Sequence, residues 1–130
     1  MNLLLDTHIF LWYISGDSRL PIQWKDAIQN SENQVYFSSV SLWECIVKFA
    51  LGQLPLPEAP HTYLPRQRAA HLITSLVLDE ASVTHFATLP LIHRDPFDRM
   101  LICQAIQYNL TLVSRDATIR SYAIPMLEES

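Results

Sequence analysis

The sequence predicts an α/β fold in which helices cover both faces of a short parallel sheet. Short apolar, β-favouring runs alternate with helix-like segments along the chain. Strands that are apolar throughout are typical of a parallel sheet buried on both faces, and helices are the usual connections between such strands. In a sheet of this kind ligands bind beyond the carboxyl ends of the strands, so functional residues are expected there.

The first half of the chain contains two predicted strands and three predicted helices. In order they are a strand at 3–5, a helix at 7–13, a helix at 21–30, a strand at 35–38 and a helix at 39–51. Ser15-Gly16-Asp17 stops the first helix, and Gly52 ends the third. Pro21 suits the first turn of the second helix, whose core face takes Ile22, Ala27 and Ile28.

The second half begins with a proline-rich connection at 52–60, which is predicted to be an ordered surface segment. The elements predicted after it are a helix at 61–70, a strand at 73–77, a helix at 79–88, a helix at 96–108, a strand at 110–113 and a short helix at 116–122. Asp95 is the expected N-cap of the helix that starts at Pro96. A last short strand is placed at Ile124 and Met126.

Composition indicates one globular domain over residues 1–130. The chain is 49% hydrophobic and 17% charged, enough apolar content for a core without disulfide or metal cross-links. Apolar runs such as 9–14 are far shorter than the roughly 20 residues of a membrane-spanning helix. The first residues lack the basic region of a signal peptide, so a soluble, cytoplasmic protein without membrane contact is expected.

Charge and cysteine usage exclude several classes of function. The net charge of −4 has the wrong sign for binding nucleic acid through a broad basic surface, so any such contact must be local. Cys45 and Cys103 lie far apart, without the spacing of a zinc or redox motif, and are expected to be buried thiols.

Two acidic residues are expected at one edge of the sheet. Asp6 directly follows the first predicted strand, and Asp116 follows the fourth with two residues between. The carboxyl ends of parallel strands meet at the same edge, which places both carboxylates where ligands bind.

Two further acids lie on the apolar faces of predicted helices. Glu44 shares its helical stripe with apolar residues four before it and three and seven after it, namely Val40, Val47 and Leu51. Asp98 aligns in the same way with residues three, four and seven further on, namely Leu101, Ile102 and Ala105. Both side chains are therefore expected to point inward.

Four converging carboxylates at Asp6, Glu44, Asp98 and Asp116 predict a bound cation. Buried ionised carboxylates are costly unless cations or strong donors compensate them, and the chain has only two lysines. Oxygen ligands favour Mg²⁺ or Mn²⁺ over zinc. Such ions activate water and bind phosphate, so phosphodiester hydrolysis is the expected chemistry.

Each acid also has a structural interpretation. Asp6 and Asp116 are candidate helix caps, and Asp98 suits the first turn of a helix. Glu44 is positioned for a capping box with Ser41 or for an ion pair with Lys48.

The residues beside the acids are weaker candidates for a functional role. Hydrogen-bonding or surface roles are expected for His8 and His93, and the tryptophans Trp12, Trp24 and Trp43 are expected to be packing residues. Arginines beside the acids are candidates for RNA phosphate contacts, namely Arg94, Arg99 and Arg115.

Four stretches together resemble the PIN domain family, in particular VapC-type toxin nucleases of toxin-antitoxin pairs. They are 3–8 (LLLDTH), 41–44 (SLWE) with Lys48 and 51–52 (LG), 93–99 (HRDPFDR), and 114–116 (SRD). The last motif often has threonine where this chain has Ser114, which keeps the hydroxyl.

The resemblance implies an α/β/α sandwich and a Mg²⁺- or Mn²⁺-dependent endoribonuclease with its site on Asp6, Glu44, Asp98 and Asp116. It also implies a homodimer inhibited by a cognate antitoxin. Ser114, Arg99 and Arg115 are the expected support or RNA contacts at this site.

Competing classes fit less well. A receiver domain of a signalling system needs a late active-site lysine, and the chain has none after Lys48. A haloacid-dehalogenase-like phosphatase needs Asp-x-Asp after the first strand, where this chain has His8 as the third residue. The remaining alternative is a PIN-like domain without catalysis that serves as a binding or scaffold module.

Overall fold

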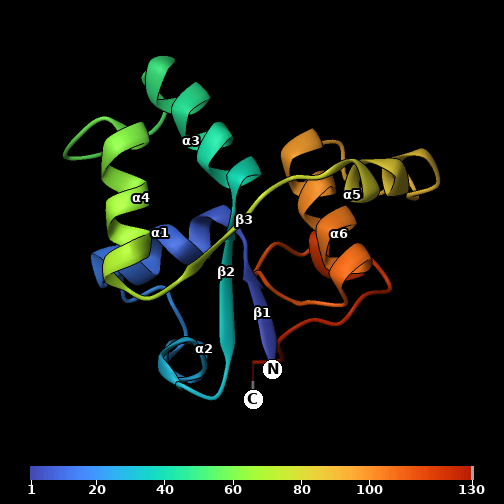
Figure 1. The fold of residues 1–130 in the computed structure, drawn as a ribbon, viewed down its shortest axis with the longest axis horizontal. Helices are drawn as coiled ribbons and strands as arrows, with labels where there is room; N and C mark the ends of the chain where they lie inside the picture. The colour runs from blue at the N-terminus through green and yellow to red at the C-terminus, as the bar shows by residue number, and fades with distance from the viewer. Residues whose placement is uncertain (130) are drawn as a thin grey trace.

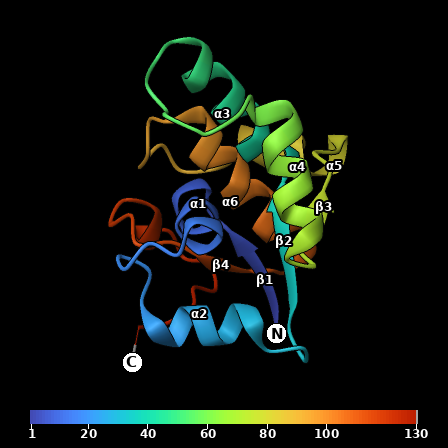
Figure 2. The same ribbon diagram turned by 90° about the vertical axis from the view of Figure 1, so that its left-hand side faces the viewer.

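Four parallel strands at the centre of an α/β/α sandwich confirm the predicted fold class. The computed structural model describes residues 1–129, so the predicted domain boundary at 130 lies just outside it. The strands are β1 (Asn2–Leu5), β2 (Gln34–Ser38), β3 (Thr74–Leu76) and β4 (Thr111–Val113). They pair in the order β3-β2-β1-β4 (Figures 1 and 2). Leu4 lies opposite Tyr36 on one side and Leu112 on the other.

The helices lie on the two faces of this sheet. They are α1 (Thr7–Ser15), α2 (Ile22–Gln29), α3 (Ser39–Ala50), α4 (Pro60–Ala70), α5 (Glu80–Thr84) and α6 (Pro96–Tyr108), with short 3₁₀ segments η1 (His85–Ala87) and η2 (Ile119–Ser121). Figures 1 and 2 show α1, α2 and α4 on one side and α5 and α6 on the other, while α3 extends beyond the carboxyl edge of the sheet.

The three leucines of β1 explain why this strand is apolar at successive positions. Leu3 and Leu5 pack into the core that contains α1, α2 and α4, whereas Leu4 packs into the opposite core beneath α6. All three are fully buried. Because side chains alternate between the faces of a strand, a run without polar residues identifies a central strand covered on both sides.

Helix ends follow the predicted signals. Asp6 caps α1 and Asp95 caps α6 by accepting backbone N–H groups of their first turns. Gly16 and Gly52 end α1 and α3 with positive φ angles of 68° and 71°, a conformation that favours glycine.

Several predicted details are wrong. The predicted helix at 79–88 divides into α5 and η1, and the one at 116–122 shrinks to η2 because Asp116 caps a tight turn before it. The last strand reduces to a single bridge between Leu112 and Met126. Ile22 is 61% exposed, and Trp24, 1% exposed, fills the core in its place.

The structure agrees with what the composition indicates about the cysteines and about membrane-spanning helices. Cys45 and Cys103 are free and buried, as predicted. Among residues 1–129, no helix combines the length and the apolar character needed to cross a membrane.

Shortening a central leucine should destabilise the fold strongly. Leu4→Ala removes a fully buried side chain between β2 and β4 and leaves a cavity, so the free energy of unfolding is expected to fall by about 2–5 kcal/mol. Urea unfolding followed by circular dichroism measures this loss. Leu91→Ala, at a position that is 74% exposed, is the matched control and should have little effect. Equal losses for both variants would contradict the assigned core.

Candidate active site

The predicted acids meet at the carboxyl edge of the sheet, where β1 and β4 lie side by side. This pair is the switch point of the sheet. From β1 the chain continues outward through β2 and β3 on one side, and it then returns to form β4 on the other side of β1. A cavity of about 440 Å³ opens there, and its lining includes all four predicted acids together with Asp95. This is the crevice that the rule for open parallel sheets identifies.

Asp6 lines this cavity and is only 5% exposed. One of its oxygens accepts the Ile9 backbone N–H at 2.9 Å, so the helix-cap interpretation is correct and compatible with a place in the site. The buried Ser114 hydroxyl hydrogen-bonds the same carboxylate and accepts the Asp116 N–H at 3.1 Å. Ser114 therefore links the residues that follow β1 and β4.

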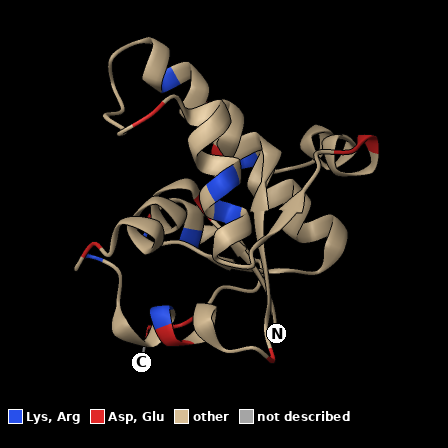
Figure 3. Ribbon diagram, turned by 60° about the vertical axis from the view of Figure 1, so that its left-hand side comes forward, with Lys and Arg blue, Asp and Glu red and all other residues tan. Residues whose placement is uncertain are grey.

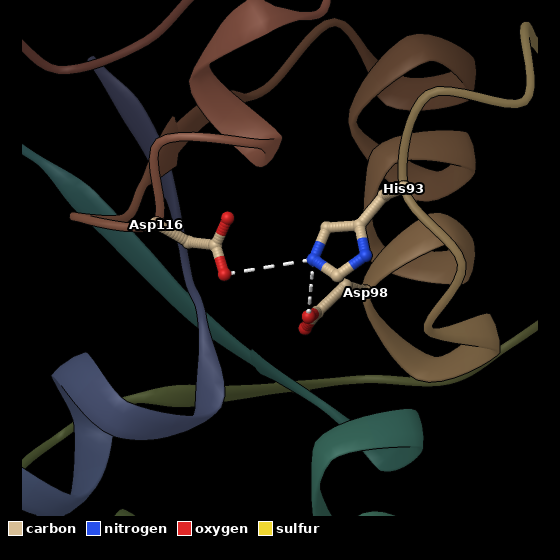
Figure 4. A group of neighbouring side chains, drawn as sticks. All are labelled: His93, Asp98 and Asp116. Carbon is tan, nitrogen blue, oxygen red and sulfur yellow. Dashed lines mark ion pairs between the residues drawn. The ribbon is translucent and has the colours of Figure 1, made fainter.

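The carboxylates of Asp98 and Asp116 both lie beside the same ring nitrogen of His93 (Figure 4). His93 Nε2 lies 3.1 Å from Asp98 Oδ2 and 3.5 Å from Asp116 Oδ2. The second oxygen of Asp116 accepts the N–H groups of Thr118 and Ile119. Asp98 comes from the first turn of α6, Asp116 from the loop after β4, and His93 from the loop that leads into α6.

The orientation of His93 is determined by its other ring nitrogen. Nδ1 accepts the backbone N–H of Asp95 at 3.1 Å, which leaves the proton of the neutral ring on Nε2, directed at the two carboxylates. Nε2 is buried and has no hydrogen-bond partner among the described residues, although both carboxylates lie close to it. Ligand-type atoms of His93, Asp98 and Asp116 lie within 4.8 Å of one another, so these three side chains could hold a cation.

Glu44 also lines the cavity and is only 3% exposed. The Thr7 hydroxyl donates to its Oε1 at 2.6 Å, and Lys48 Nζ donates to its Oε2. The predicted ion pair is present, but it joins a buried glutamate instead of lying on the surface. The capping-box interpretation is wrong, because Ser38 caps α3 and the Ser41 hydroxyl is buried elsewhere.

The stripe drawn through Glu44 is only partly buried. Val40 packs in the core, as predicted, whereas Leu51 is 65% exposed because α3 has left the sheet by that point. Asp98 shares its stripe with Leu101, Ile102 and Ala105, all buried as predicted.

The electrostatics of the site favour a cation. Burial, with the charges of Asp95, Glu44, Asp6 and Asp116, raises the pKa of Asp98 to about 8. Burial also raises the pKa of Asp6, and the nearby Asp116 adds to that effect. Acids that resist ionisation because they repel one another become fully ionised when a divalent cation binds them, and all of these donors are oxygens that suit Mg²⁺ or Mn²⁺.

Basic side chains border the cavity without forming a broad patch. Lys48, Arg19 and Arg115 line it, and Figure 3 shows lysines and arginines dispersed over several helices and loops. Burial lowers the pKa of Lys48, but the hydrogen bond to Glu44 and the charges of Glu44, Asp95 and Asp98 more than offset this, so the pKa is raised. Trp12, expected only to pack, also lines the cavity, whereas Trp24 is a core residue as predicted.

Arg99 and Arg115 occupy different environments. Arg115 lies at the cavity and donates to the Arg19 carbonyl at 3.2 Å. Arg99 instead stacks over the Phe86 ring at 4.1 Å and donates to the Leu89 carbonyl. The position of Arg99 does not support an RNA contact, because its guanidinium is held between α6 and the α5–η1 segment.

Sequence reasoning missed three members of the site. The sequence predicts only a surface or hydrogen-bonding role for His93 and only an ion pair on the helix surface for Lys48, and it indicates no role for Thr7. The available signal was spacing: His93 precedes Asp98 within the same short motif, and Thr7 directly follows Asp6.

Comparisons with known proteins agree with this geometry. The sequence model of the PIN domain matches residues 3–125, and the chain therefore belongs to the PIN domain family. It is 25% identical to ribonuclease VapC22 of Mycobacterium tuberculosis over 95% of this chain and 94% of that protein. Ribonuclease VapC16 of the same organism is 31% identical over 45% of this chain and 41% of its own length. The resemblance to VapC-type proteins noted from the sequence is confirmed.

Solved structures show the same fold. VapBC2 from Rickettsia felis, bound to a DNA fragment from their promoter, superimposes with a TM-score of 0.72, covering 98% of each chain at 16% sequence identity. VapBC-1 from nontypeable Haemophilus influenzae superimposes with a TM-score of 0.66 over 98% of each chain at 15% identity.

Proposed function

We propose that this chain is a Mg²⁺- or Mn²⁺-dependent endoribonuclease, the toxin of a type II toxin-antitoxin pair. The observation that carries the proposal is the convergence of Asp6, Glu44, Asp98 and Asp116 on one cavity at the switch point of the sheet. The similarity to ribonucleases VapC22 and VapC16 supports RNA as the substrate.

The residues take distinct roles in this proposal. Asp98 and Asp116, which belong to one group of ligand-type side chains, would hold the cation with Asp6, which Ser114 and the Ile9 N–H keep in position. A divalent cation bound there lowers the pKa of an attacking water and stabilises charge on the leaving oxygen. His93 Nε2 lies beside both aspartates, and Arg115, which lines the cavity, would contact a phosphate of the RNA.

The partners belong to the same proposal. A cognate antitoxin would inhibit the enzyme, and a homodimer acting in the cytoplasm is the expected form. Support for the antitoxin comes from the structural likeness to VapBC2 of Rickettsia felis and VapBC-1 of Haemophilus influenzae. A PIN-like module without catalysis remains the alternative that the experiment below decides.

RNA cleavage by the purified protein tests the proposal. Wild type should cut total RNA with Mg²⁺ or Mn²⁺ and not with a chelator. Asp6→Asn should be inactive under every condition, because it removes the charge while an asparagine still caps α1. Asp26→Asn, on the exposed face of α2, is the matched control and should cut like wild type. Cleavage by Asp6→Asn, or none by wild type with either ion, would favour the non-catalytic module.

A further inference from the structure

We propose that the site binds one divalent cation, and that the ammonium group of Lys48 takes the place beside Glu44 that a second cation would fill. The inference rests on the proposed metal-dependent function. It concerns which of the acids bind a metal ion and which is neutralised by a lysine of the protein. In nucleases with paired ions, two divalent cations are clamped by one carboxylate cluster.

Both oxygens of Glu44 are already engaged within the protein. Oε1 accepts the Thr7 hydroxyl at 2.6 Å, and Oε2 accepts the Lys48 ammonium. Glu44 is 3% exposed, so this neutralised carboxylate is part of the interior and not a free surface group. A divalent ion at Glu44 would have to displace Lys48 or bind beside its positive charge.

Lys48 is held at this position by the helix itself. It lies one turn after Glu44 on α3, the spacing at which a glutamate and a lysine meet on one face. Its side chain is 36% exposed, and it borders the same cavity as Asp95 and Asp98. An ammonium group supplies a compact positive charge that needs no set of ligands, so it can compensate Glu44 permanently.

The other possible metal ligands form a group that does not include Glu44. Among the described residues, His93, Asp98 and Asp116 form a group whose ligand atoms lie within 4.8 Å of one another, and Glu44 is not a member. Asp98 and Asp116 each contribute an oxygen to this group, whereas both oxygens of Glu44 accept hydrogen bonds from Thr7 and Lys48. The acids therefore divide into a metal-binding part at Asp98 and Asp116 and a part neutralised by Lys48.

Counting bound Mn²⁺ tests this division without RNA or catalysis. Titrating wild type with Mn²⁺ and measuring free ion by electron paramagnetic resonance should give about one ion per chain, and Lys48→Met should give about two. Lys48→Arg, which keeps the charge, should remain at about one. Lys25→Met removes the other lysine, exposed on α2, and should behave like wild type. Circular dichroism of each variant establishes that it is folded.

The possible results separate this inference from the proposed function. Two ions on wild type would overturn the role of Lys48 and leave a metal-dependent nuclease intact. One ion on folded Lys48→Met would also overturn it, because the vacated place would then not bind a cation. No ion on wild type would remove the metal-dependent function itself, and the inference with it. If Lys48→Met does not fold, Lys48→Gln repeats the count with a neutral, polar side chain.

Discussion

Asp98→Asn is expected to lower RNA cleavage by about a hundredfold to a thousandfold, as loss of one preorganised electrostatic group typically does. The same change should raise the thermal stability of the metal-free protein. Both effects have one cause: the carboxylate is buried among other acids, where in the proposed function it would help to hold a cation and where it repels its neighbours when none is bound. The asparagine keeps the shape and removes the charge.

The stability effect has a defined pH window. The pKa of Asp98 is about 8 in the folded protein against an ordinary value of 3.8, so as the pH rises the unfolded chain releases this proton first. Its destabilising contribution is therefore absent below about pH 4, grows as the pH rises toward 8 and is constant above that. When a chelator is present, the melting temperature of Asp98→Asn should exceed that of wild type, and this difference should increase as the pH rises from 4 to 8.

Calorimetric melts at pH 5, 7 and 9 measure this gain. Addition of Mg²⁺ should raise the melting temperature of wild type more than that of Asp98→Asn, because ligand binding to the folded state alone stabilises it. Asp26→Asn, exposed on α2, is the matched control and should follow wild type at each pH. A lower melting temperature for Asp98→Asn than for wild type at pH 9, without metal, would show that the acids do not repel one another as described.

The fold was predictable because local patterns agree with the architecture. The run Leu3-Leu4-Leu5 is apolar because both faces of β1 are covered, and its end at Asp6 marks the edge where the site forms. Asp6 and Asp116 could be placed together from strand order alone, since parallel strands share their carboxyl ends. Caps and turns such as Asp95 and Gly52 depend on local conformation and are visible in sequence for that reason.

The missed features depend on tertiary contacts that have no periodic signature. His93 reaches Asp116 across the cavity because the loop before α6 is anchored by the Tyr122 hydroxyl, which accepts the backbone N–H of His93 at 2.9 Å. Arg99 follows Asp98 by one residue, and one step along a helix turns a side chain by about 100°, which directs it toward Phe86 and away from the site. Neighbours in sequence therefore have separate environments.

Metal affinity should depend on pH through Asp98. A cation binds the ionised carboxylate, so below pH 8 it must displace a proton, and the apparent affinity for Mg²⁺ is expected to rise by nearly tenfold per pH unit from pH 6 and less steeply as the pH approaches 8. Above the pKa of about 8 no proton remains on this group, and the affinity should level off. The proton released on binding should fall from close to one per ion at pH 6 toward zero at pH 9.

Titration calorimetry in two buffers of different ionisation enthalpy counts these protons directly. Asp79→Asn is the matched control: Asp79 caps α5 away from the cavity and its pKa is lowered mainly by hydrogen bonding to Ser82, so this variant should keep the pH dependence of wild type. Affinity that is the same at pH 6 and 8 would mean that Asp98 is already ionised before the cation arrives. The crowding of Asp6, Glu44 and Asp116 around it would then be compensated by the protein alone, and the electrostatic reason for a bound cation would be lost.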